Sequence, residues 1–440
     1  MNDFDSNEEL NPEEFAKFLR DFLAKQSGLD PEQLAKVAGI PNTPEAVAEL
    51  QRQLQAALSA SEQQTTGGVN WQLATDQARQ IARSESRAIS EESRRSIAEA
   101  ASIATLWINE ATTVGELFTE PKLLTRELWV ADAIGLFQQL SQPVAQRMAT
   151  ALAETMRSNL PEELSGMGGG ASQFMKAAGG ALFAMQLGQA LGKLSTRVVS
   201  GGDVGLPIFA DRAALVPQNL HELIRSLEVE QDQAYIYLIV REFAFARLFK
   251  QRNWLRDSIV AQVTAYASEI SIDTDGLRDL AEQIDLNNPE ELRGALESGA
   301  LIAERTEEQE RALAAIETLL ALIEGWVEVV TENSTKLLPK SAAIAEAMRR
   351  RRATTGPAEL TFGTLVGLEL RPRRMREAAE MWRQVTAAVG IEVRDEIWAH
   401  PDLLPTSEEI DHPELLIARL KAQGSSSTMD DEIRKLLDGN

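Results

Sequence analysis

A single carboxylate interrupts an apolar helix face in the middle of the chain. Residues 231–250 read QDQAYIYLIVREFAFARLFK, and a 3.6-residue period lines up one face along them. The members of that face are Tyr235, Leu238, Ile239, Glu242, Phe245, Ala246 and Phe249. Because a carboxylate on an apolar surface costs free energy unless it is paired, Glu242 is a general base, a metal ligand or half of an internal salt bridge. The residue types alone favour the salt bridge, with an arginine from another helix as the partner.

The spacing around Glu242 matches the frame of a zinc-binding helix. In the H-E-x-x-H motif, two histidines on one helix face bind zinc, and the glutamate after the first histidine activates a metal-bound water. The frame falls on residues 241–245, which read Arg-Glu-Phe-Ala-Phe, so the glutamate is present and both histidines are replaced. Arginine has no lone pair to offer and phenylalanine has no donor atom. Arg241 and Phe245 are therefore motif positions that lack ligands.

Several strings resemble the zincin-like metallopeptidase family, which includes actinobacterial chains described as hydrolases or zinc-dependent metalloproteases of unknown substrate. They are residues 235–249 with 253–256, 201–207 (GGDVGLP), 319–330 (LLALIEGWVEVV), 349–376 with 361–374 (TFGTLVGLELRPRR), and 398–405 (WAHPDLLP). The resemblance covers roughly residues 70–415 and implies a zincin-like helical body. It also implies a base at Glu242 and a third metal ligand at Glu324, and we interpret both as vestigial.

The ligand set implied by the resemblance is incomplete, so no cofactor is expected. A zinc site needs three protein ligands, and here each of two helices supplies one carboxylate. A site made only of carboxylates suits Mg²⁺ or Ca²⁺ but needs more oxygens, and Glu328 is one further candidate.

Histidine is the remaining source of a zinc ligand, because the chain has no cysteine. The three histidines are His221, His400 and His412. His221 begins the string H-E-L-I-R and is expected at the surface or at a helix cap, while the other two lie beside prolines in expected turns. Zinc is expected only if the fold brings a histidine, with His221 as the first candidate, beside Glu242 and Glu324.

Eight arginines lie within 28 residues of a strongly acidic chain. They are Arg349 to Arg352, Arg371, Arg373, Arg374 and Arg376. Guanidinium groups bind phosphate or carboxylate in a bidentate way, so Arg371, Arg373 and Arg374 form a candidate anion site. The same arginines are equally suited to pair with the acidic helices of the chain, and this structural use is favoured.

The composition restricts the partners. With 44 Lys and Arg against 67 Asp and Glu, the net charge of −23 repels phosphate backbones, so no nucleic-acid partner is expected. The absence of cysteine excludes disulfides and agrees with a reducing cytoplasm, where we expect the protein to be located. The most apolar stretch, residues 174–199, contains three basic residues, and no membrane span is expected.

The sequence predicts a mainly α fold, because helix-forming residues dominate and alternating β-branched runs are scarce. Residues 198–209 are the best candidate for a strand and turn. Small residues recur from Gly179 to Gly192, a spacing typical of two closely packed helices. We expect an acidic helical N-terminal appendage with a linker at 1–65, the zincin-like helical body at 66–422, and a mobile C-terminal tail at 423–440.

These features predict a metallopeptidase-like protein that has lost zinc binding. Such a pseudo-enzyme acts as a non-catalytic scaffold or interaction protein with an unknown protein or peptide partner, and assembly with further copies of the chain is left open. The alternative is an active metal-dependent hydrolase, a zinc metalloprotease, with Glu242 as general base and a non-standard ligand set.

Overall fold

The structure is a computed structural model that describes residues 69–84, 86–158, 168–209, 211–227, 229–269, 305–353, 363 and 374–423. The predicted N-terminal appendage at 1–65 and nearly all of the predicted tail lie outside these residues. The chain divides into two compact units, and the second contains Trp71–Gln146, Leu182–Ile270 and Arg305–Asn440. Every residue of the site described below belongs to this second unit.

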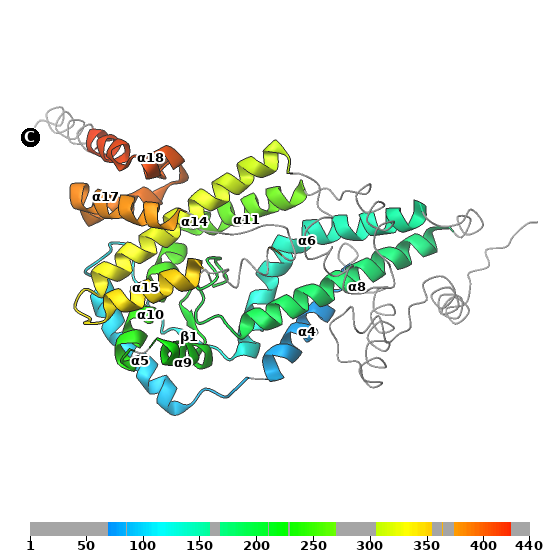
Figure 1. Ribbon diagram of the computed structural model, residues 1–440, viewed down its shortest axis with the longest axis horizontal. Coiled ribbons are helices and arrows are strands. Elements are labelled where there is room, and N and C mark those ends of the chain that lie inside the picture. The colour runs from blue at the N-terminus through cyan, green and yellow to red at the C-terminus, as the bar shows by residue number, and fades with distance from the viewer. Residues whose placement is uncertain are drawn as a thin grey trace, which may run out of the picture. The chain divides into compact units, whose positions relative to one another are not determined.

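The described part of the chain is mainly helical, as the sequence predicts (Figure 1). Its longer helices are α4 (Trp71–Ser84), α5 (Glu91–Ile108), α6 (Arg126–Ser158), α8 (Gly168–Ser195), α9 (Pro217–Ser226), α10 (Gln231–Gln251), α11 (Asn253–Ser268), α14 (Glu307–Ser334), α15 (Ser341–Ala353) and α17 (Met375–Glu396). Short 3-10 turns at Ile397–Ala399 and Pro401–Leu403, helix α18 (Ser407–Asp411) and a helix at 413–423 follow.

Helix α10 lies at the centre of the second unit and is buried on nearly every side. It packs against α5 and α14, and also meets α9, α11 and α15. All members of the predicted apolar face are buried, but so are the residues between them from Ala234 to Phe249, with Arg241 partly exposed. A helix that is apolar all round belongs in a core, so the single stripe predicted from the sequence understates its burial.

A small sheet positions the loop that precedes α9. Strands β1 (Lys122–Leu123) and β2 (Ala214–Leu215) pair in parallel, and Ser200 forms an antiparallel bridge to Leu215 on the other side of β2. The predicted strand at 198–209 is reduced to this bridge and is followed by turns. Glycines at 201, 202 and 205 and a proline at 207 account for the difference, because both residue types disfavour regular strands.

Helices α14 and α17 approach each other closely at Gly325. A Cβ atom at this position would lie 2.7 Å from the backbone nitrogen of Ala379 and 2.9 Å from the carbonyl carbon of Ala378. Only glycine therefore fits without moving one of the two backbones. The contact fixes the position of α14 along α17, and Glu324 is the preceding residue of α14.

The small residues of α8 serve helix packing, as predicted. A Cβ atom on Gly188 would lie 2.6 Å from the carbonyl oxygen of Ala74, and one on Gly192 would lie 2.6 Å from the Cβ of Ile81. Helix α8 therefore packs closely against α4, and the side chains of Gln77 and Ile81 lie directly on its glycines. None of the described helices combines the length and the apolar character that crossing a bilayer requires.

A buried carboxylate at the end of α17 ties three parts of the second unit together. Asp395 accepts hydrogen bonds from the hydroxyl of Thr112 (2.6 Å), the backbone N–H of Thr113 (2.8 Å) and the indole N–H of Trp326 (2.9 Å). It also pairs with the guanidinium of Arg394 at 2.7 Å, and both charged side chains are fully buried. The loop after α5, helix α14 and helix α17 thus share one charged network.

Candidate functional site

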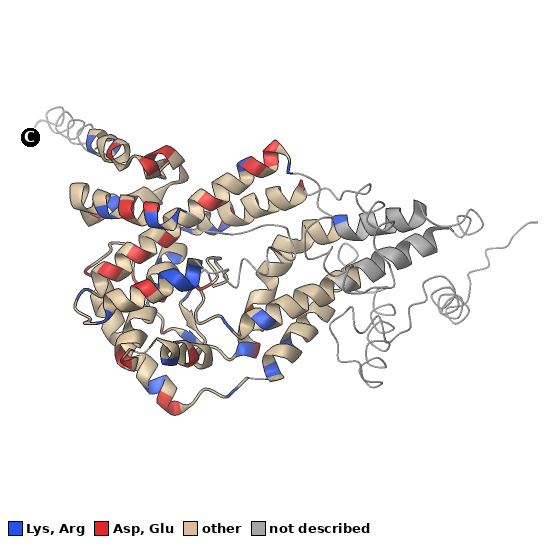
Figure 2. Ribbon diagram, viewed as in Figure 1, with Lys and Arg blue, Asp and Glu red and all other residues tan. Residues whose placement is uncertain are grey.

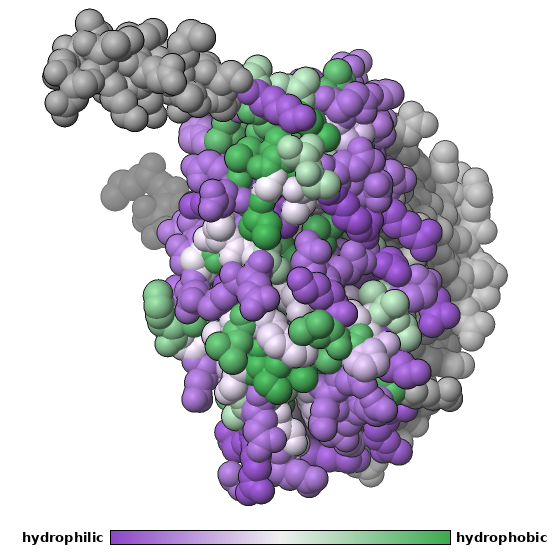
Figure 3. Space-filling model, turned by 90° about the vertical axis from the view of Figure 1, so that its left-hand side faces the viewer, coloured by the Kyte–Doolittle hydropathy of each residue, from purple (hydrophilic) through white to green (hydrophobic). Residues whose placement is uncertain are grey.

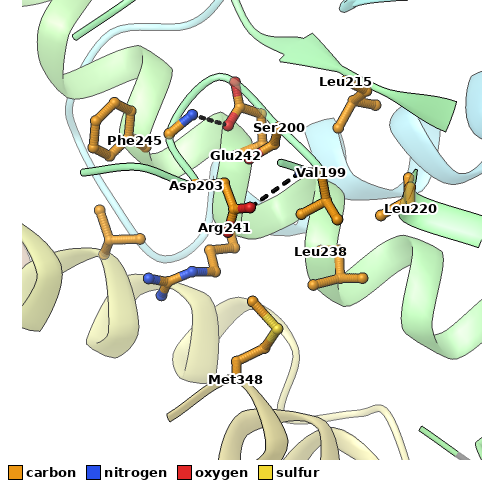
Figure 4. A pocket seen from close by; sticks show the side chains of 12 residues that line it. Val199, Ser200, Asp203, Leu215, Leu220, Leu238, Arg241, Glu242, Phe245 and Met348 are labelled. Atoms are coloured by element: carbon orange, nitrogen blue, oxygen red, sulfur yellow. Dashed lines mark hydrogen bonds between the residues drawn. The ribbon is translucent and has the colours of Figure 1, made fainter. Parts of the chain in front are cut away.

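The Glu242 carboxylate forms hydrogen bonds with backbone N–H groups and not with a charged side chain (Figure 4). It accepts hydrogen bonds from the backbone N–H groups of Gly202, at 2.8 Å, and Ala214, at 2.9 Å. The predicted salt bridge between Glu242 and an arginine is therefore wrong. The partners come from the loop and strand beside α10, so the carboxylate fastens this segment to the central helix.

Burial sets the acidity of Glu242. The side chain is 2 % exposed, and desolvation raises its pKa from the ordinary 4.5 to about 7. The backbone donors of Ala214 and Gly202 and the Ser200 hydroxyl act in the opposite direction, while the nearby charge of Asp203 adds to the rise. The carboxyl group therefore changes protonation near neutral pH, in the range expected of a general base.

This raised pKa predicts a pH dependence of stability. The native state keeps the Glu242 proton to higher pH than the unfolded state, so the free energy of unfolding falls as pH rises from about 4.5 to about 7, by up to roughly 3 kcal/mol from this group. Glu242→Gln removes the titrating group. Urea denaturation at several pH values is expected to give the variant a flatter profile than the parent over this interval. Equal slopes for the two proteins would contradict the assignment.

The arginine expected beside Glu242 is found instead at Glu324. The guanidinium of Arg241 pairs with one carboxylate oxygen of Glu324, and the guanidinium of Arg352 pairs with the other. Glu324 is 1 % exposed, and it is held between α10 and α15 from its position on α14. The first motif position and the implied third ligand position thus contact each other directly, as a cation and an anion.

A second buried carboxylate anchors α15 to the glycine-containing loop. Asp203 accepts a hydrogen bond from the backbone N–H of Val199 at 3.0 Å and pairs with the guanidinium of Arg351. Burial alone would raise its pKa, but the charges of Arg351 and Arg352 outweigh this and hold the pKa below its ordinary value. Arg352 also donates to the backbone oxygen of Asp203 at 2.8 Å, so neighbouring arginines bind the loop and Glu324 together.

Gly205 leaves the room that this arrangement requires. Its φ angle of 70° lies in the left-handed region, which favours glycine. A Cβ atom there would lie 2.9 Å from a terminal nitrogen of Arg352 and 3.4 Å from a carboxylate oxygen of Glu324. The loop therefore lies directly against the ion pair, and a larger residue at this position would displace it.

The other arginines of α15 continue the same pattern along α14. Glu328 and Glu332 follow Glu324 at intervals of one helical turn, and both pair with Arg349 of α15 and Arg383 of α17. Figure 2 shows the basic residues gathered at the end of α15, close to acidic residues of α14. Three turns of α14 thus present carboxylates that arginines of the neighbouring helices neutralise.

A small cavity of about 20 Å³, the space of about one water molecule, lies beside Glu242. Its lining includes Arg241, Glu242 and Phe245 from α10, Asp203 from the loop and Met348 from α15. In Figure 4 the Arg241 and Glu242 side chains extend from α10 in different directions, Glu242 toward the loop and Arg241 away from it. The ring of Phe245 packs against the ring of Phe249 at a centroid distance of 4.7 Å.

The three histidines do not complete the site. His221 is exposed on α9, as predicted, and His400 and His412 are exposed next to the short helices after α17, where their nearest charged partners are Asp402 and Glu414. Among the described residues there is no group of three or more His, Cys, Asp or Glu side chains with the spacing of a metal site.

The candidate anion site is only partly described. Arg371 and Arg373 lie outside the described residues. Arg374 pairs with Asp411 and donates to the backbone oxygen of Ser407 at 3.2 Å. Anion binding at these arginines therefore remains a prediction.

The residues in the 241–245 frame do not fit a zinc ion. Arg241 directs a positive charge at the carboxylate that would be the third ligand, and Phe245 offers no donor atom. The sequence identifies Glu242 and Glu324 as candidate site residues, but it does not indicate Asp203. It also does not indicate that the arginines pair with Glu324 while Glu242 binds backbone N–H groups. The adjacent glycines at 201 and 202 are the sequence feature that indicates a close approach of this loop to Glu242. A Cβ on Gly201 would lie 2.9 Å from a Glu242 oxygen.

Comparison with known proteins places the fold of the chain among known ones. The model of a family described as zincin-like metallopeptidase matches residues 69–417. A solved structure, described as that of a "putative hydrolase with a novel fold" from Chloroflexus aurantiacus, is similar with a TM-score of 0.54 and 21 % sequence identity. The match covers 80 % of this chain and 99 % of that one, and it shows a shared fold. None of the curated proteins matches the chain.

Proposed function

Because the chain belongs to the zincin-like metallopeptidase family, we propose that it is a member that has lost zinc binding and acts as a non-catalytic scaffold or interaction protein. The observation that carries the proposal is the ion pair between Arg241 and Glu324. A zincin places its metal between the first histidine of the motif and the third ligand. In this chain, Arg241 occupies the position of that histidine, and its guanidinium forms an ion pair with Glu324, the carboxylate at the third-ligand position.

The engagement of both remaining carboxylates supports the proposal. Each oxygen of Glu324 faces a guanidinium, and each oxygen of Glu242 accepts a backbone N–H. A zinc ion would have to displace at least one of these buried interactions. The displaced partner would then be left as an unpaired buried group, at a cost of several kcal/mol for a buried charge. No histidine lies among these partners to offset that cost.

The surface supports an interaction role. Several large apolar side chains are exposed, among them Phe118 (86 %), Leu337 (72 %) and Leu106 (68 %). On the face shown in Figure 3, apolar residues form separate patches surrounded by hydrophilic ones. Exposed aromatic and aliphatic side chains favour contact with a protein or peptide partner, which includes a further copy of the chain. The cysteine-free composition supports a cytoplasmic location as part of the same proposal.

A second candidate function is an active metal-dependent hydrolase with Glu242 as general base. The observation that favours it is the pKa of about 7 at Glu242, beside a cavity of the size of one water molecule. A group with this acidity removes a proton from water efficiently at neutral pH. The candidate requires a non-standard ligand set that includes Glu324, and His221 would have to approach it from the exposed face of α9.

Metal content separates the two candidates. Protein purified without chelator is expected to contain far less than one equivalent of zinc, manganese or magnesium by inductively coupled plasma mass spectrometry. It is also expected to show no peptidase activity on a mixed peptide library, with or without added zinc. Glu242→Gln and Glu324→Ala should leave both results unchanged. One equivalent of zinc that disappears in Glu324→Ala would refute the proposal, and peptidase activity that is lost in Glu242→Gln would in addition establish the hydrolase.

A further inference from the structure

Two guanidinium groups surround Glu324, the carboxylate that the family resemblance implies as the third metal ligand. Arg241 reaches Glu324 from α10 and Arg352 reaches it from α15, one on each oxygen. The Glu324 side chain is almost completely buried, and Arg241 and Arg352 are themselves only 16 % and 10 % exposed. An unpaired carboxylate in this place would be strongly unfavourable, so Glu324 requires positive charge in its immediate surroundings.

We propose that the guanidinium groups of Arg241 and Arg352 replace a divalent cation as the counter-charge of Glu324. This inference deepens the proposed function and rests on it. The two guanidinium groups carry the same total charge as Zn²⁺. Arg241 joins α10 to α14, the two helices on which the family resemblance implies ligand positions, and Arg352 adds a link from α15 to α14. The chain thereby keeps the cross-link between its central helices while it dispenses with the metal.

Phe245 completes the replacement at the second ligand position. It lies one turn after Arg241 on α10 and lines the same cavity. A Cβ on Gly202 would lie 2.6 Å from the Phe245 ring, so the ring packs directly on the loop backbone and fills this place. An imidazole is similar in width but smaller, so histidine at 245 is compatible with the packing and brings a donor atom.

The test restores the two histidines. Arg241→His and Phe245→His together recreate the frame and free one oxygen of Glu324, while Glu242 stays in place. Zinc titration by isothermal calorimetry is expected to show one ion bound per chain, at least about a hundredfold tighter than the parent chain. The melting temperature should rise on zinc addition in the double variant and not in the parent chain, because an ion that binds only the native state stabilises it.

Two controls define where the zinc binds. Adding Glu324→Gln to the double variant is expected to weaken zinc binding at least about tenfold, because it removes the negative charge of the third ligand, beside two neutral histidines. Glu310→His with Ala314→His places an i,i+4 histidine pair on an exposed face of α14. This pair reports the affinity of any two helical histidines and should bind more weakly than the restored frame.

The outcomes distinguish the inference from the proposed function. Zinc bound to the parent chain would refute the proposed function and with it the inference. A folded double variant that binds zinc no better than the parent or the exposed pair would refute the inference and leave the proposed function intact.

A second measurement applies if the double variant does not fold. Arg241→Met, Glu324→Gln and their combination form a double-mutant cycle for the melting temperature. The combined variant is expected to melt clearly higher than the sum of the single losses predicts, because it removes the charge of Arg241 together with that of its partner Glu324, whereas each single variant leaves the other charge behind. Additive losses would show that Arg241 is not the counter-charge of Glu324 and would overturn the inference.

Discussion

Glu324→Ala is expected to lower the free energy of unfolding by about 3–5 kcal/mol, as removal of one partner from a buried ion pair does. The loss is large because Arg241 and Arg352 both keep their charge when the carboxylate is removed. Each guanidinium then remains in a place with little access to water, and the smaller alanine side chain adds a void. Urea denaturation followed by far-ultraviolet circular dichroism measures the change at constant pH and salt.

An exposed ion pair gives the matched control. Glu308 pairs with Arg311 on the first turns of α14, and the two side chains are 61 % and 71 % exposed. Glu308→Ala is expected to change the free energy of unfolding by no more than about 0.5 kcal/mol, because exposed pairs contribute little. A Glu324→Ala effect below about 1 kcal/mol, close to this control, would show that the carboxylate is not required by the arginines around it.

Asp395→Ala is expected to have an equally large effect, about 3–5 kcal/mol, far from the 241–245 frame. Its carboxylate satisfies Thr112, Thr113, Trp326 and Arg394, and all of these partners lose an acceptor in the variant. The fully buried Arg394 keeps only its bonds to Ala111 and Thr386. Chemical denaturation gives the stability, and near-ultraviolet circular dichroism reports whether the environment of Trp326 changes.

Glu396→Ala is the control for this second variant, because Glu396 is the exposed neighbour of Asp395 and lies in the same turn of the helix. Its effect is expected to be within about 0.5 kcal/mol. The pair Arg394→Met with Asp395→Asn removes both charges and should recover part of the stability lost in Asp395→Ala. If the paired variant is as unstable as the single one, the buried charge of Arg394 is not the cause.

The sequence was most informative where the signal is local. The 3.6-residue spacing placed Glu242 among buried residues, and the motif frame identified Arg241 and Phe245 as positions without ligands. Helix-forming composition predicted the mainly α fold, and the small residues of α8 predicted a close helix contact. Each of these features depends on residues a few positions apart, which is the range over which periodicity and propensity act.

The partners of the charged residues could not be predicted, because they depend on contacts across long stretches of chain. Arg241 and Glu324 are 83 positions apart, and Arg351 and Asp203 are 148 apart. The apolar surroundings of a carboxylate predict that it needs a partner, but they do not say which kind, because a backbone N–H can stabilise the carboxylate as a guanidinium can. Glu242 took the backbone donors because β2 and the loop at 201–202 lie against α10, which no local pattern encodes.

The contact at Gly325 determines how accurately the neighbouring carboxylate is placed. Successive residues of a helix point about 100° apart, so Gly325 faces α17 while Glu324 faces α10 and α15. Because the two backbones are in direct contact and the core is close-packed, α14 cannot shift along α17 or rotate by a small amount. The alignment of Glu324 with its two arginines therefore depends on an uncharged backbone contact on a different side of α14, and the shape of the core determines how precisely these ion pairs are positioned.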